Sequence, residues 1–114
     1  MQMGALPAVR SHLSQADQKR ANKLQQLEFA LQLSHPQVFT SYRAAKSWAL
    51  TELSQHPQRY SGDNHDWHVE VFPAQSGYEC SISQYWWSAD HCGVCRPTGA
   101  LAIVQAVLEL GAGY

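Results

Sequence analysis

Segment 98–110 constrains the fold most strongly, because it is a helical sequence with almost no polar side. Thr98 is a typical N-cap residue, and Gly111 is a typical helix stop. Apolar residues fill most positions between them, and Gln105 and Glu109, four residues apart, form only a narrow polar strip. A helix that is apolar nearly all round is buried. We therefore expect the rest of the chain to wrap around it.

Two helices are predicted upstream. The first begins near Ser14, where Ser14-Gln15-Ala16-Asp17 resembles a capping box, and ends near Ser34, because Pro36 disfavours helix in the residue before it. The second runs from Ser41 to Ser54. Its apolar residues recur at the spacing of a helix that is buried on one side; they are Tyr42, Ala45, Trp48, Ala49 and Leu53.

An antiparallel hairpin is predicted between the second helix and the last. A half-buried strand is predicted where Trp67, Val69 and Val71 alternate with His68, Glu70 and Phe72. Segment 74–77 is a turn, and a second strand runs from Tyr78 to about Trp87. This spacing places Pro73 opposite Tyr78. Because two strands alone are marginal, a third strand, around Val94, or firm helix packing is needed.

The expected fold class is therefore α+β. It consists of two N-terminal amphipathic helices, an antiparallel β-hairpin or small sheet, and a buried C-terminal helix. Segment 1–12 has no periodicity and is expected to be loose. Residues 13–114 are expected to form one domain, since 114 residues with 45% hydrophobic content suffice for a single core.

The register of the hairpin divides its side chains between two faces. One face is apolar and includes Val69, Ile82 and, by alternation, Trp86. The other face carries polar and aromatic residues, and four of them form the predicted contact patch, namely Asp66, His68, Tyr85 and Trp87. Aromatic residues with a polar rim are typical of interface centres. The competing interpretation is that helices or a second subunit cover this face, and a homodimer would satisfy both.

The motif Cys92-Gly93-Val94-Cys95 is half of a tetrahedral zinc site. The completing ligands would come from His65, His68, Cys80 or His91, but His65 and His68 project to opposite faces of one strand. We therefore expect two free thiols, and no metal or cofactor; a small zinc-stabilised domain is the alternative. A redox role is disfavoured because no βαβ unit surrounds the motif.

Catalytic signatures are not evident in the sequence. It contains no phosphate-binding glycine loop, no His-Glu-x-x-His and no Gly-x-Ser-x-Gly. Cys92 or Cys95, with His91 or His68 and with Asp90, supplies the residue types of a cysteine hydrolase without a recognisable family pattern. Whether the protein is an enzyme stays open, and a non-catalytic role is favoured.

The charges are unevenly distributed along the chain. Residues 1–60 hold seven basic groups against three acidic ones, whereas residues 61–114 hold one against six. Lys19, Arg20 and Lys23 suggest, as an alternative, a nucleic-acid-binding module that uses the N-terminal helices. The net charge of −1 disfavours it. We expect a binding or regulatory protein that docks on another protein or on a second copy of itself, with no membrane partner.

A cytoplasmic location is also expected. The first residues lack the charged and apolar regions of a secretory signal, and three cysteines fit poorly with a disulfide framework.

Overall fold

The computed structural model describes residues 15–60, 66–84, 87–90 and 95–112, and for 87–90 it describes the backbone only. Along the chain the elements are α2 (Gln15–Ser34), the 3-10 helix η2 (Pro36–Phe39), α3 (Tyr42–Gln55), the 3-10 helix η3 (Pro57–Tyr60), β1 (Trp67–Ala74), β2 (Gly77–Gln84), β3 (Trp87–Asp90) and α4 (Gly99–Gly111). The predicted α+β class is confirmed. The predicted loose segment 1–12 lies outside the described residues.

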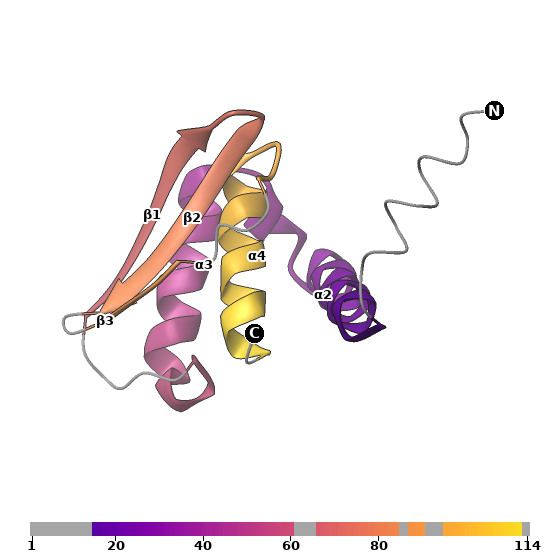
Figure 1. Ribbon diagram of the computed structural model, residues 1–114. Coiled ribbons are helices and arrows are strands. Elements are labelled where there is room, and N and C mark those ends of the chain that lie inside the picture. The colour runs from indigo at the N-terminus through magenta and orange to yellow at the C-terminus, as the bar shows by residue number, and fades with distance from the viewer. Residues whose placement is uncertain (1–14, 61–65, 85–86, 91–94, 113–114) are drawn as a thin grey trace.

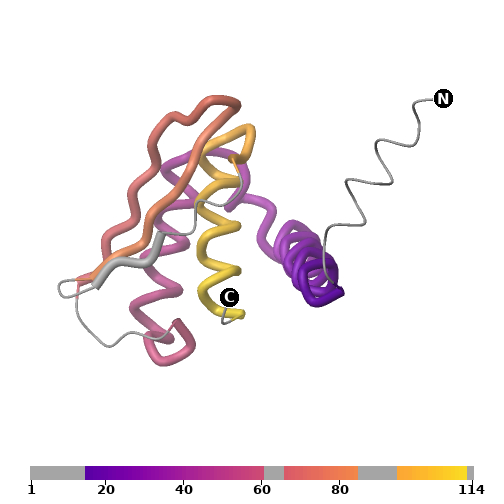
Figure 2. The backbone as a smooth tube through the Cα atoms, in the orientation of Figure 1, coloured from indigo at the N-terminus to yellow at the C-terminus, as the bar shows by residue number. Residues whose placement is uncertain are grey.

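Three antiparallel strands form a sheet in the order β1-β2-β3, and α3 and α4 cover one of its faces (Figure 1). These two helices run side by side in the same direction. Gly99 at the start of α4 lies against Tyr42 at the start of α3, and Gly111 at its end lies against Tyr60, just beyond α3. Helix α2 lies on the side of α4 away from the sheet, as the backbone trace in Figure 2 shows.

Helix α4 forms the centre of the core, as its sequence predicts. The hydroxyl of Thr98 accepts a hydrogen bond from the amide of Leu101 at 3.1 Å and caps the helix. Seven of its thirteen residues are buried; they are Ala100, Ala102, Ile103, Val104, Ala106, Val107 and Leu110. Gln105 and Glu109 are only partly exposed, because α2 lies beside the polar strip.

Helix α3 supplies the second wall of the core. The hydroxyl of Ser41 caps it by accepting a hydrogen bond from the amide of Ala44 at 3.0 Å. Small residues face inward and let the two helices approach, and Ala45, Ala49 and Leu53 are fully buried. Tyr42 lies on the side of α3 that faces α4, against Gly99, but it is not buried as predicted: the residue is 45% exposed, since the first turn of α3 lies at the end of the helical layer.

The predicted hairpin register is confirmed, with Pro73 opposite Tyr78 and Val69 opposite Ile82. The predicted extent of the second strand is wrong, however. Strand β2 ends at Gln84, and the chain reverses so that Trp87 begins β3 opposite Gln84. Aromatic residues favour strands and carry no turn signal, so the sequence gives no warning of this reversal.

A third strand is present, but it is β3, at 87–90, earlier in the chain than the segment around Val94 that was predicted; Val94 itself lies outside the described residues. After β3 the chain pairs with β2 once more, through one isolated bridge near the start of β2. The backbones of Tyr78 and Arg96 exchange two hydrogen bonds, at 2.8 and 3.0 Å. A methyl group added to Gly77 would collide with the carbonyl oxygen of Arg96. Gly77 is therefore required by the close approach of the two segments.

Helix α2 has the predicted extent but contributes little to the core. None of its twenty residues is buried. Leu24, Leu27 and Leu31 follow helical spacing and are partly covered, whereas Phe29 is 60% exposed and Leu33 71% exposed. The helix is thus attached to the domain along one stripe only.

Candidate functional site

The face of the sheet opposite the helices is the surface that the sequence prediction singled out. The register pairs His68 with Ser83, Glu70 with Ser81 and Phe72 with Glu79, and directly opposite residues share a face. We call this surface the outer face and define it by Asp66, His68, Glu70, Phe72, Glu79, Ser81 and Ser83. No described helix lies over it (Figure 1).

Two of the four predicted patch residues have described side chains. Asp66 directly precedes β1 and His68 lies within it, and both are exposed. Tyr85 lies outside the described residues. Trp87 is described by its backbone alone, in β3 opposite Gln84. The prediction that Trp87 lies on the outer face assumed that one strand continues from Tyr78 to Trp87. Because β2 ends at Gln84, that argument no longer applies.

The structure adds aromatic residues near the hairpin turn. Phe72 is 39% exposed on the outer face, where its alternation with Val71 predicted it. Tyr78 was expected on the apolar face but is 40% exposed, because the turn extends past the helices. A shallow groove of about 440 Å³ borders it, lined by Tyr42, Val71, Pro73, Tyr78, Pro97, Thr98 and Gly99.

The cysteines bear on the alternative of a zinc-stabilised domain. Cys80 is buried, 1% exposed, as predicted for an ordinary core cysteine. The thiol of Cys95 donates a hydrogen bond to the Glu79 carboxylate at 3.4 Å. Within the described parts of the chain, no three His, Cys, Asp or Glu side chains lie close enough together to hold a metal ion. Cys92, His91 and His65 lie outside them.

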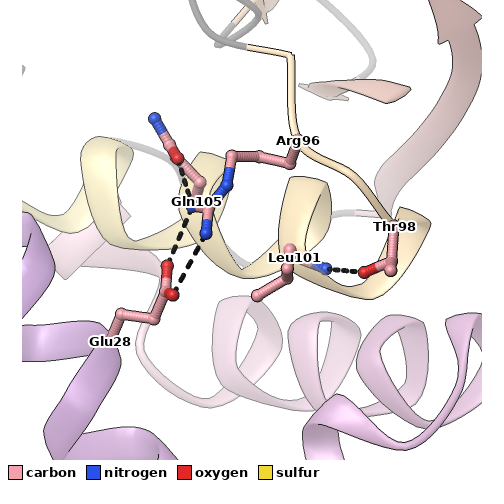
Figure 3. Close-up of polar contacts among 5 residues, drawn as sticks. All are labelled: Glu28, Arg96, Thr98, Leu101 and Gln105. Atoms are coloured by element: carbon pink, nitrogen blue, oxygen red, sulfur yellow. Dashed lines mark hydrogen bonds and ion pairs between the residues drawn. The ribbon is translucent and has the colours of Figure 1, made fainter. Parts of the chain in front are cut away.

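A cleft of about 540 Å³ separates α2 from α4, and Arg96 spans it (Figure 3). The guanidinium donates to both oxygens of Glu28, at 2.9 and 3.1 Å, and also donates to the side-chain oxygen of Gln105. Such two-pronged arginine–carboxylate pairs are the stronger and more specific ones. The partners are 68 residues apart in sequence, so spacing analysis does not identify the pair.

The remaining charges of this cleft also offset one another. Burial raises the pKa of the Glu109 carboxyl, while the charge of Arg20 and a hydrogen bond with Gln105 act in the opposite direction. Each positive group thus lies near a carboxylate. The arrangement accounts for the attachment of α2 to α4 without a bound ligand.

A second polar cluster joins α3 to η3. The hydroxyl of Tyr60 donates to the Glu52 carboxylate at 2.6 Å, and Arg59 contacts the same carboxylate oxygen at 3.1 Å. Burial, and then the hydrogen bond to Glu52, raise the pKa of Tyr60 to about 12. The cluster lies at the opposite end of the helices from the hairpin turn, and its role is structural.

Comparison with protein-family models, curated proteins and solved structures finds no match. None of the described helices combines the length and the apolar composition that a membrane crossing requires.

Proposed function

We propose that this chain is a small cytoplasmic protein-binding module that docks on another protein through the outer face of its sheet. One observation supports the proposal most. The two helices that cover the sheet lie on its other face, and the outer face presents a half-exposed Phe72 beside exposed His68 and Glu70. An aromatic residue within a polar rim is typical of the centre of a protein interface.

Charge also supports a protein partner. Glu70, Glu79 and Asp66 lie on or beside the outer face, and acidic groups repel phosphates. The alternative function, nucleic-acid binding, would use Lys19, Arg20 and Lys23 on α2. Arg20, however, lies in the cleft near Glu109, which draws it away from an outside ligand.

Immobilised protein tests the proposal by capture of a partner from nuclease-treated lysate. We expect Phe72→Ala with His68→Ala to abolish capture of at least one protein that the wild type retains, since buried aromatics carry most interface energy. Phe29→Ala on α2 is the matched control, because it removes an exposed phenyl ring from another surface. Equal capture by both variants would contradict the proposal.

The alternative is tested by titration of labelled DNA and RNA. Replacement of Lys19, Arg20 and Lys23 by glutamate would then abolish binding, and wild-type affinity would fall steeply between about 50 and 200 mM salt as counterions are released. Such a result, with capture unaffected by the Phe72 and His68 variant, would favour nucleic acid. A separate Tyr85→Ala variant tests whether the predicted patch extends to that residue.

A further inference from the structure

Strand β1 is an edge strand, and the hydrogen bonds of its neighbour reveal which of its backbone groups face outward. In the strand order β1-β2-β3, nothing among the described residues pairs with the far side of β1 (Figure 1). The N–H of Tyr78 in β2 donates to the Arg96 carbonyl, and the Tyr78 carbonyl accepts from the Arg96 N–H, both on the side away from β1. Pro73, opposite Tyr78, therefore directs its backbone away from β2.

Regular alternation extends this orientation along the strand. The register runs without a bulge, so Val69 and Val71, like Pro73, direct N–H and C=O toward the open edge, while Glu70 and Phe72 bond to β2. Pro73 agrees with this assignment, because a residue without an N–H is tolerated in a sheet where its nitrogen faces an edge. An open edge of this kind is a template for another strand.

We propose that the strand added to this edge is β1 of a second copy, antiparallel and centred on Val69. In this register Val69 lies opposite itself and exchanges two backbone hydrogen bonds with its copy. His68 lies opposite Glu70 of the second copy, and Glu70 opposite its His68. The result is a twofold-symmetric dimer with one continuous sheet of six strands. The proposal concerns the edge of the sheet and does not depend on the function proposed for its outer face.

The carboxylates and Pro73 select this register among its neighbours. Moving the centre to Glu70 would place two glutamates directly opposite each other, which is unfavourable. Moving it to His68 would place Glu70 opposite Asp66, another like-charged pair. Centring on Val71 would require Pro73 to donate to Val69, although Pro73 has no N–H. Only the register centred on Val69 places His68 and Glu70 together.

The same register places its polar pairs where they interact best. His68 and Glu70 form non-hydrogen-bonded pairs across the new boundary, in which the Cα atoms are about 4.5 Å apart and side chains meet closely. Both side chains are exposed in the single chain, so their pairing requires no rearrangement of the core. Val71, which is half-buried, would be covered further by Trp67 of the second copy.

Sedimentation of the wild-type chain and of charge variants tests the dimer. We expect a wild-type dimer over a roughly hundredfold range of concentration. Glu70→Lys removes the carboxylate that faces the His68 imidazole in both symmetry-related pairs and puts an ammonium group in its place, so we expect the dissociation constant to rise roughly tenfold. The double variant His68→Glu with Glu70→Lys places a carboxylate opposite an ammonium group in both pairs and should restore wild-type affinity.

Amide exchange by NMR tests the edge independently of side-chain substitution. In an isolated chain the amides of Val69 and Val71 face water and exchange much faster than those of Glu70 and Phe72. In the proposed dimer all four are protected, and Glu70→Lys selectively exposes Val69 and Val71. A monomer, a dimer in which these two amides exchange rapidly, or protection only after a different protein is added would each overturn the proposal.

The outer-face function and the edge dimer give separable results. Phe72→Ala with His68→Glu and Glu70→Lys retains the edge charge pairs and removes the outer-face aromatic side chain. We expect this triple variant to keep the protected amides of Val69 and Val71. Capture of another protein is compared between this triple variant and the His68→Glu, Glu70→Lys double variant. The two differ at Phe72 alone, so either proposal can fall while the other stands.

Discussion

Helix α4 has thirteen residues, seven of them buried, whereas α2 has twenty residues and none of them is buried. Both helices are regular and both were predicted from sequence. The difference lies in what holds them. Helix α4 is fixed by contact with α3 and with the sheet, while α2 rests on three partly covered leucines and on the pair between Glu28 and Arg96. Helix formation therefore does not reveal how much a segment contributes to stability.

The largest expected effect separates these two regions directly. Ile103 in α4 is fully buried, and Ile103→Ala should lower the free energy of unfolding by about 3–4 kcal/mol through lost burial and a cavity. Urea titration measures this change. A loss below about 1 kcal/mol would show that α4 is not the centre of the core.

The loss of stability at alkaline pH tests the contribution of Tyr60, which lies at the end of the helical layer opposite the hairpin turn. Because folding raises the pKa of Tyr60 from 10.0 to about 12, the folded state holds its phenolic proton more tightly than the unfolded state. This contribution is complete below about pH 10 and should be lost as the pH rises toward 12. Thermal melts of wild type and of Tyr60→Phe, which cannot ionise, measure it. Identical slopes in the two proteins would contradict the assignment.

The attachment of α2 is expected to be weaker and local. Glu28→Gln removes the charge that Arg96 faces while keeping the shape of the side chain. We expect amide exchange throughout α2 to accelerate by roughly tenfold, which corresponds to about 1.4 kcal/mol, with little change in the global melt. A comparable loss of stability in α4 amides would mean that α2 and the core unfold together.

The smallest effect is expected on the far side of α2. Phe29 is 60% exposed, so Phe29→Ala should change the free energy of unfolding by no more than about 0.5 kcal/mol. The same urea titration applies. A loss near that of Ile103→Ala would show that this side of α2 is covered in solution, and the contrast between the two helices would disappear.

Local patterns predicted much of this fold because local chemistry determines it. Thr98 caps α4 as expected, and the length of the turn fixes which residues of β1 lie opposite those of β2. The reversal before Trp87 was missed, because no glycine, proline or asparagine marks it. Periodicity likewise identifies the apolar stripe of α2 but does not show how completely other elements cover it.

The candidate site was predicted only in part for similar reasons. Strand alternation placed His68 and Phe72 on the same face. The pair between Arg96 and Glu28 joins distant parts of the chain, and nothing in either local sequence encodes it. The orientation of the β1 edge depends on a bridge between Tyr78 and Arg96, which only the assembled fold supplies.

Gly77 has a consequence for how this sequence tolerates change. The Arg96 carbonyl lies so close to the Cα of Gly77 that only a hydrogen atom fits between them. Any other residue must therefore force the hairpin turn away from the segment that leads into α4. A library that samples every amino acid at this position and is selected for folded protein should return glycine. Position 76, next to it in the exposed turn, should return a broad mixture. In the sequence, Gly77 looks like an ordinary turn glycine. We expect it to be invariant among folded variants, because the neighbouring backbone fills the space that a side chain would need.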